Sequence, residues 1–401
     1  MTQDTRKNSG AEAVLMPMGA MSVEGKIRQR VRPWIEAIIE EEVEAVLGAT
    51  LSQRTETRGG YRHGTRERTL TTSLGPTTIH MPRARLQQAD GSTTEWHSQA
   101  VRRYQRRTEL VDEAILGVYL SGTNTRRIKG ALAPLLRGGP LSKDAVSRLV
   151  GRLAGDFETW RTRDLAADAI QYLIMDGWYP KVRIGKRRER VPVLVTLGVR
   201  ADGERIVLDI RLAGDESTAA WRDVIASLVD RHIGLPALAI IDGSAGLAAA
   251  LREQWPTLAV QRCTTHKLRN LEAKAPARLR EELAEDYRRM IYGESRTAVE
   301  QARGRFLKKW KLRCPAVCEC LEEAGDDLFT FLAFPKTQWK ALRTTNALER
   351  INEEFRRRTK TQASLPSQDA VLLLLFGLLR TGQVKLRRLD GWQEMKQLKA
   401  A

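Results

Sequence analysis

Three acidic residues stand where carboxylates can bind divalent metal ions. Asp176 follows an apolar run at residues 170–175, and Asp242 follows another at residues 238–241. Glu349 lies in a polar, helix-like segment at residues 344–350. Two acids at strand ends and one from a helix can converge on a pair of divalent ions, which is the chemistry that cuts and joins phosphodiester bonds. Mg²⁺ suits this arrangement because it binds a few carboxylates and keeps positions for phosphate and water.

Each acid also has an ordinary structural interpretation. An Asp-Gly pair after a strand is usually a turn, but two such pairs at corresponding places in one α/β pattern favour a shared site. A glutamate on a helix is normally a solvated member of an ion pair. Glu353 lies one helical turn beyond Glu349, and Glu354 follows it, so spacing alone does not choose among the three.

The elements that must position the two aspartates form an α/β pattern. We expect strands at residues 170–175, 191–199, 205–212, 237–241 and 258–261, and helices at residues 221–229 and 246–254. This order is that of an RNase H-like domain, in which the first and fourth strands are neighbours and bring Asp176 and Asp242 side by side. The fold class is therefore α/β, with a five-stranded mixed sheet flanked by helices.

The rest of the chain is predicted to be mainly helical. A helix at residues 25–47 precedes an arginine-rich β-hairpin at residues 54–85, whose short strands we place at 69–73 and 77–81. Two interpretations fit the hairpin equally well: a solvent-exposed hairpin, and a hairpin whose arginines bind phosphate groups. Residues 110–153 predict three helices with helix-turn-helix character, although three-helix folds are common without DNA.

These patterns divide the chain into six segments. They are a disordered arm at 1–25, an N-terminal DNA-binding region at 26–165, the first part of the core at 166–272, a helical insertion at 273–340, the final core helices with Glu349 at 341–380, and a basic tail at 381–401.

Composition points to a polyanionic partner. The 401 residues include 67 lysines and arginines against 49 acids, a formal net charge of +18. Such a charge favours nucleic acid, because each neutralised phosphate releases counterions; solubility through net charge is the alternative. Four cysteines do not make a disulfide framework, and no apolar run is long enough to span a bilayer. We expect a soluble cytoplasmic protein with no membrane partner.

Several segments resemble the signatures of Mutator-type transposases of bacterial insertion sequences. They are Asp176-Gly177, Asp242-Gly243, residues 261–270 (QRCTTHKLRN) and residues 344–352 (TTNALERIN), with residues 122–128 (GTNTRRI) and 81–85 (MPRAR) resembling the family's N-terminal half. The resemblance covers about residues 50–380. Its most diagnostic element is the Cys-x-x-His motif with its flanking Gln-Arg and Arg-Asn pairs.

The resemblance implies a function and a set of ligands. It makes Asp176, Asp242 and Glu349 the catalytic, metal-binding triad, which selects Glu349 over the neighbouring glutamates. Family members cleave 3′ ends at terminal inverted repeats and join them to target DNA with Mg²⁺, for which Mn²⁺ can substitute. The expected partners are double-stranded DNA, both element ends and target, and further copies of the chain in a dimer or larger assembly, bound to the bacterial nucleoid through DNA.

Cys263 and His266 form a second candidate cluster. The pair supplies half of a zinc site, which Cys314, Cys318 or Cys320 could complete. Zinc is not favoured, because small buried cysteines usually belong to the core. The resemblance implies instead a structural or DNA-contacting role beside the acids, with His266 near the scissile phosphate.

The remaining candidates are basic side chains expected to contact DNA. With Cys263 and His266, the set comprises Arg269, Arg350, Arg356, Arg357, Arg148, Lys143, Arg83 and Arg85. The stretch at residues 182–190 is more basic than the resemblance leads us to expect and can add phosphate affinity.

Two other functions fit part of the pattern. An RNase H-like nuclease would cut DNA without joining it. A repressor that binds DNA through residues 110–153, with a degenerate catalytic domain, would fit the charge but would leave the three acids unexplained.

Overall fold

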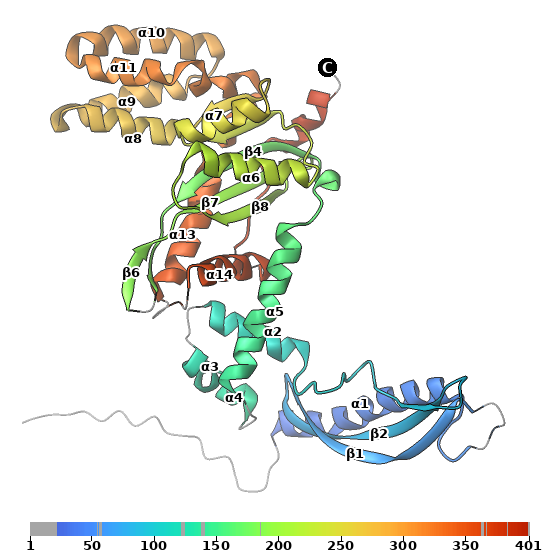
Figure 1. The fold of residues 1–401 in the computed structure, drawn as a ribbon. Coiled ribbons are helices and arrows are strands. Elements are labelled where there is room, and N and C mark those ends of the chain that lie inside the picture. Colours follow the sequence, from blue (N-terminus) through green and yellow to red (C-terminus); the bar gives the residue numbers. More distant parts are fainter. Residues whose placement is uncertain are drawn as a thin grey trace, which may run out of the picture. The chain divides into compact units, whose positions relative to one another are not determined.

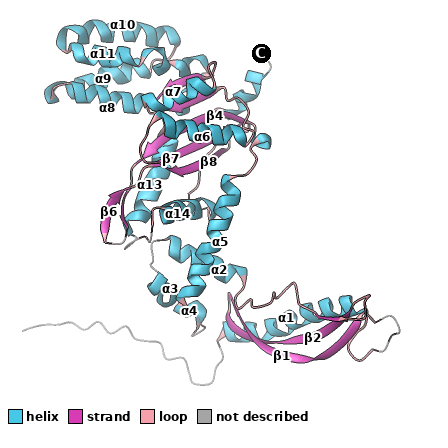
Figure 2. Ribbon diagram, viewed as in Figure 1, coloured by secondary structure: helices cyan, strands magenta, loops and turns pink. Residues whose placement is uncertain are grey.

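The chain folds into two compact units. The computed structural model describes residues 22–53, 55, 58–121, 125–137, 141–184, 186–361, 365, 367–382 and 384–399. Unit one consists of the described residues up to 116 and residues 126–145, and unit two of those in 117–125 and from 146 onward. Figure 1 gives the element labels and Figure 2 their types.

Unit one is built from a long helix against an antiparallel sheet. Helix α1 spans Val23–Leu47, and the strands are β1 (Gly60–Thr72), β2 (Gly75–Gln87) and β3 (Thr93–Glu95), in the order β1-β2-β3. The Ser22 hydroxyl accepts a hydrogen bond from the Gly25 amide at the start of α1, and Gly48 ends the helix in the left-handed region. Ile39 of α1 packs with Leu70, Ile79 and other apolar residues of the sheet.

Two predictions for this region need correction. Residues 1–21 of the expected arm lie outside the described residues, but Ser22 and its successors already belong to α1 and its cap. The hairpin is confirmed, but its strands have 13 residues each and are not short. The exposed positions of β1 lie mostly in its middle, at residues 64–67, where the charged Arg66 and Glu67 interrupt the apolar pattern.

The three helices predicted between residues 110 and 153 are found as four, because the second is split into two short helices at Leu132. They are α2 (Glu109–Leu120), α3 (Thr125–Ala131), α4 (Ala133–Leu136) and α5 (Lys143–Arg161). The Ser142 hydroxyl accepts from the Ala145 amide, as a capping serine should. Residues 122–124 and 138–140 lie outside the described residues. Both α2 and α5 have residues in each unit.

The described part of unit two contains the predicted five-stranded mixed sheet. Its strands are β4 (Ile170–Trp178), β7 (Val193–Arg200), β8 (Arg205–Leu212), β9 (Leu238–Ile241) and β10 (Ala259–Arg262), in the order β10-β9-β4-β7-β8. Strand β4 is parallel to β9 and antiparallel to β7. The prediction that the strands of Asp176 and Asp242 are neighbours is confirmed.

Helices cover both faces of this sheet. Helices α6 (Thr218–Asp230) and α7 (Ala245–Gln254) pack on the face that carries Leu173 and Met175. The opposite face meets α13 (Asn346–Thr361), where the Phe355 ring lies 5.8 Å from the Trp178 ring. Because side chains alternate along a strand, Asp176 points to the α13 side.

The remaining helices follow β10. They are α8 (Thr264–Lys274), α9 (Arg280–Ile291), α10 (Arg296–Arg313), α11 (Pro315–Glu323), α12 (Trp339–Leu342) and α14 (Asp369–Arg380), with short 3₁₀ segments at Ala166–Asp168, Ala277–Leu279, Gly325–Leu328, Thr330–Ala333, Lys336–Gln338 and Trp392–Lys399. Helices α8 to α11 share a core around the buried Trp310. The basic C-terminal segment packs on the sheet unit, since Trp392 lies against Gly203.

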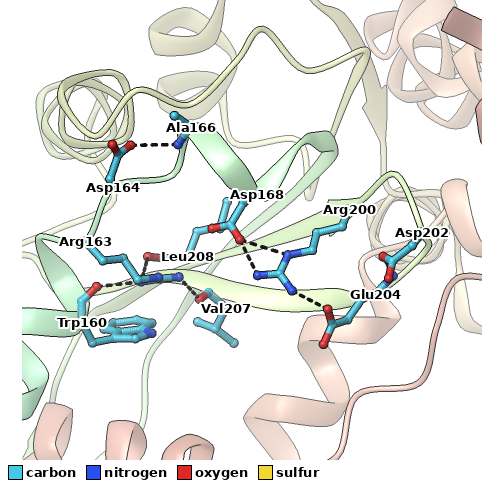
Figure 3. Close-up of polar contacts among 10 residues, drawn as sticks. All are labelled: Trp160, Arg163, Asp164, Ala166, Asp168, Arg200, Asp202, Glu204, Val207 and Leu208. Carbon is cyan, nitrogen blue, oxygen red and sulfur yellow. Dashed lines mark hydrogen bonds and ion pairs between the residues drawn. The ribbon is translucent and has the colours of Figure 1, made fainter.

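Arginines protect the outer edge of β8 (Figure 3). The Arg163 guanidinium donates to the carbonyls of Val207 (2.9 Å) and Leu208 (3.4 Å), and that of Arg231 donates to Leu208 (3.1 Å). Burial lowers the pKa of Arg163 to about 10. These bonds satisfy carbonyls that an unprotected edge strand would offer to another chain.

A small hairpin was not predicted. Strand β5 (Lys181–Ile184) pairs with β6 (Arg187–Arg190) immediately after β4. Among the described residues, no helix has the length and apolarity needed to cross a membrane.

Candidate active site

Asp176 and Asp242 lie at equivalent positions of two neighbouring parallel strands. Met175 of β4 is opposite Ile241, the last residue of β9, so the next residue in each segment is an aspartate: Asp176 within β4 and Asp242 just after β9. The Ser244 amide donates to an Asp242 carboxylate oxygen at 2.8 Å, which fixes that side chain at the start of α7. The apolar runs before both acids form the interior of the sheet. They hold the pair at the C-terminal ends of β4 and β9, which we call the carboxyl edge of the sheet.

This pair carries unfavourable negative charge. The Asp176 side chain is buried, and burial together with the nearby Asp242 carboxylate raises the pKa of Asp176 to about 8. Two close carboxylates in a dry site need a cation beside them if both are to be ionised. The donor set, two carboxylate groups with oxygen ligands only, is that which Mg²⁺ or Mn²⁺ prefers.

Cys263 and His266 lie beside the aspartates. Cys263 directly follows β10, which is parallel to β9, and precedes α8. Its sulfur accepts hydrogen bonds from the amide and hydroxyl of Thr345, both at 3.4 Å. Cys263 is fully buried, so its sulfur is not exposed to solvent. Burial would raise the pKa of this thiol, but hydrogen bonds from His266 and Thr345 outweigh it and lower that pKa.

His266 supplies positive charge at this edge. The hydrogen bond between His266 and Cys263, together with the negative charges of Asp176 and Asp242, raises the pKa of His266 to about 9. Burial alone would lower this pKa. This shift favours the cationic form of the imidazole. The expectation that His266 stands next to the acids agrees with this placement.

Glu349 reaches the same region from α13 but is not gathered with the aspartates. Its carboxylate pairs with the Arg269 guanidinium at 3.1 Å and lies 3.9 Å from the His266 ring nitrogen Nε2. Across the described residues, no three histidine, cysteine or acidic side chains are grouped closely enough to hold a metal ion. The structure thus brings two of the three predicted ligands together and links the third to them through His266.

Glu216 is a fourth acid at this edge that the sequence interpretation missed. Its carboxylate lies so close to the backbone of Gly177 that a Cβ atom there would overlap its Oε1 atom. The Tyr179 hydroxyl donates to Glu216 at 3.3 Å. Burial and the Asp242 charge raise the pKa of Glu216. The signal available in the sequence was the glycine after Asp176, which leaves room for a carboxylate.

Comparisons with known proteins agree with this arrangement. Residues 2–386 match the family model described as Transposase, Mutator family. The chain belongs to the Mutator family of transposases. It is 34% identical to the transposase for insertion sequence element IS406 of Burkholderia multivorans, over 84% of each chain. It is 31% identical to that for ISRM5 of Rhizobium meliloti, over 88% of this chain and 86% of the relative.

A third relative extends the match over nearly the whole chain. The transposase for IS1081 of Mycobacterium tuberculosis is 31% identical over 96% of this chain and 89% of its own length. The chain is therefore an insertion-sequence transposase, and the DNA on which it acts is that of a transposable element.

The basic residues predicted to contact DNA lie mostly in water. Those exposed in this transposase are Arg85, Lys143, Arg148, Arg269, Arg350, Arg356 and Arg357. Besides Arg269, which pairs with Glu349, two of the predicted set have acidic partners: Arg83 pairs with Glu95 at 3.1 Å and Arg357 with Glu354 at 2.5 Å. An exposed pair of this kind is worth little, so both arginines can exchange a carboxylate for a phosphate.

Unit one of the transposase also contains a basic cavity that was not predicted. It has a volume of about 430 Å³ and is lined by Arg66, Arg68, Arg103, Arg106, Thr69, Thr71, Glu95, His97 and Tyr104. Arg68 is held by the carbonyls of Arg102 (2.8 Å) and Gln105 (2.5 Å). The cavity joins the long hairpin to the segment after β3, a long-range contact that sequence spacing does not reveal.

Proposed function

We propose that this transposase binds the terminal inverted repeats of its element, cleaves the 3′ ends and joins them to target DNA. The side-by-side position of Asp176 and Asp242 on β4 and β9 is the observation that supports this most strongly. The order of strands and the mixed sheet support an RNase H-like assignment for the catalytic core.

Asp176, Asp242 and Glu349 are the proposed metal ligands. Mg²⁺, or Mn²⁺ in its place, would activate the attacking oxygen and neutralise charge on the scissile phosphate. The raised pKa of Asp176 fits this assignment, because a bound cation would relieve the repulsion that raises it. Glu349 would join the aspartates by leaving its pair with Arg269, whose guanidinium is exposed and can turn to a phosphate.

The residues around the acids have supporting roles in this proposal. The charged His266 ring can donate a hydrogen bond to a phosphate oxygen, and Cys263 and Thr345 hold that ring in place. Glu216 adds negative charge behind Asp242 and so increases the demand for a cation. Exposed arginines of α13, including Arg350 and Arg356, would hold the DNA backbone.

DNA-end recognition is proposed for the N-terminal part of the chain. Arg83, Arg85 and the cavity at Arg66 offer phosphate contacts in unit one, and Lys143 and Arg148 lie on α5. A dimer or larger assembly is expected, because two element ends must be brought together for joining.

The test is a strand-transfer assay with the full-length transposase, labelled inverted-repeat oligonucleotides and a plasmid target in Mg²⁺. Joined products that carry the labelled 3′ end support the proposal. Nicked ends without joined products would favour a nuclease that only hydrolyses. End binding without any metal-dependent nicking would favour a DNA-binding repressor.

A further inference from the structure

One face of the β5–β6 hairpin consists of four basic side chains. The register pairs Lys181 with Arg190 and Arg183 with Arg188. Directly opposed residues of an antiparallel pair share a face, and every second residue along a strand returns to it. All four side chains are exposed. We name Lys181, Arg183, Arg188 and Arg190 the hairpin cation face.

This face is electrostatically unfavourable in the free protein. Like charges directly opposite each other on neighbouring strands destabilise a sheet, and here both cross-strand pairs are of that kind. Within the described part of the chain, none of the four has an ion-pair partner, unlike the exposed Arg222, which pairs with Glu253. The hairpin's one acid, Glu189, lies on the opposite face and accepts from Gln368 at 3.4 Å.

The opposite face anchors the hairpin to unit two. Val182 is almost fully buried, and the Leu365 amide donates to the Arg183 carbonyl at 2.8 Å. Ile184 forms a β-bridge with Leu365, which follows α13. A short ribbon held in this way fixes the backbone positions that carry the four cations, so the backbone does not need to be ordered on binding.

The hairpin is also close in the chain to the candidate active site. Its first residue, Lys181, comes five positions after Asp176 and three after Trp178, the last residue of β4. In Figure 1 the strand β6 projects from the sheet beside the far end of α13, the helix that carries Glu349. A DNA backbone held by this face would therefore lie beside the strand that carries Asp176.

We propose that the hairpin cation face binds the phosphate backbone of target DNA, without regard to base sequence, during joining; this rests on the proposed function. Arginine guanidiniums match phosphate oxygens with two parallel hydrogen bonds. The face has no amide or hydroxyl side chain, and such groups serve readout of bases other than guanine. A surface that reads charge alone suits the DNA partner whose sequence is not fixed, and that partner is the target.

The experiment uses the full-length protein with Lys181→Gln, Arg183→Gln, Arg188→Gln and Arg190→Gln combined. The matched control removes four exposed charges of unit two that lie away from the hairpin, through Arg278→Gln, Arg305→Gln, Lys308→Gln and Lys311→Gln. Three activities are compared: binding of inverted-repeat oligonucleotides, cleavage at the 3′ end, and joining of pre-cleaved ends to a plasmid. Affinity for a random-sequence duplex is also measured against salt concentration.

The hairpin variant should join pre-cleaved ends at least about tenfold more slowly than wild type, while end binding and cleavage change less than about twofold. The salt slope for random duplex should fall by about 0.9 for each phosphate that the variant no longer neutralises, and so by up to about 3.6. The control variant should retain wild-type joining. Thermal unfolding should not move to lower temperature, because the substitutions remove opposed like charges.

Two results would overturn the inference. Equal losses of end binding, cleavage and joining would mean that the face holds the element end instead of the target. Unchanged joining and an unchanged salt slope in a folded variant would mean that the face does not bind DNA. If the wild-type protein neither cleaves nor joins, the proposed function fails on its own, and an unchanged random-duplex slope would still reject DNA binding by the hairpin.

Discussion

Asp176 and Asp242 extend side by side from neighbouring parallel strands, because Met175 and Ile241, the residues before them, are register partners. Both strands are buried along their length, so a shift in register would move apolar residues out of the core. The register of the sheet therefore places the backbones of the two aspartates side by side.

Metal binding should stabilise the wild-type protein through this pair. At a Mg²⁺ concentration of about 100 times the dissociation constant, the free energy of unfolding should rise by about 2.7 kcal/mol. Thermal unfolding with and without Mg²⁺ measures this. The shift should be largely absent in Asp176→Asn and retained in Asp223→Asn, which alters an exposed aspartate of α6. Equal shifts in all three proteins would show that the ion binds elsewhere.

Glu216 should contribute to catalysis without contributing to DNA-end binding. We expect Glu216→Gln to slow cleavage about tenfold, equivalent to about 1.4 kcal/mol. Gly177→Ala should have a similar effect, because its Cβ would overlap a Glu216 carboxylate oxygen and displace it. Cleavage rates and end-binding constants are compared for both variants. Wild-type cleavage rates in both would remove Glu216 from the site.

The ion pair between Lys267 and Glu323 should make the free energy of unfolding depend on pH. Hydrogen bonds from Arg262 (2.8 Å) and Lys267 (2.6 Å) lower the pKa of Glu323 to about 2, from 4.5. Since the folded-state pKa is depressed, this contribution is fully present above pH 4.5 and is lost as pH falls toward 2. Denaturant unfolding at several pH values measures it.

Glu323→Gln isolates that contribution. Lys267 is almost fully buried, so losing its acidic partner should cost about 1–3 kcal/mol, less than for a fully buried pair because Glu323 is exposed. The stability difference between wild type and variant should shrink as pH falls from 4.5 toward 2. A difference that stays constant over this range would contradict the assignment. Glu319→Gln on the same helix serves as the exposed control.

Arg163 should protect the β8 edge. Arg163→Ala leaves the Val207 carbonyl without its donor and should lower the free energy of unfolding by about 1–3 kcal/mol. Urea unfolding measures this, and light scattering should reveal more self-association, because an exposed edge can pair with another chain. Arg161→Ala, which removes only a surface pair with Glu158, is the control. Equal stability of the two variants would show that water replaces the arginine at no cost.

The sheet was predictable from sequence where strands are apolar throughout. The runs before Asp176 and Asp242 are buried on both faces, and such strands have few alternative interpretations. The β5–β6 hairpin was missed because its apolar positions reduce to Val182 and Ile184, too few to show an alternating pattern. For a similar reason, the sequence interpretation assigned only residues 69–73 and 77–81 to the long strands β1 and β2.

The candidate site was predictable only in part. The two aspartates could be paired because their positions follow from strand order. Glu216 lies in the loop before α6, and loop positions carry no periodic signal. The Glu349 pairing with Arg269 joins helices 80 residues apart in the chain, and nothing in the spacing of either helix specifies which way the carboxylate turns.

The most direct test of the catalytic assignment is strand transfer by Asp176→Asn and Asp242→Asn in Mg²⁺, with Asp223→Asn as control. Loss of a metal ligand should remove several kcal/mol of transition-state stabilisation, so both variants should join ends at least about 10³-fold more slowly while binding inverted repeats normally. Cleavage and joining at the wild-type rate by either variant would contradict the assignment.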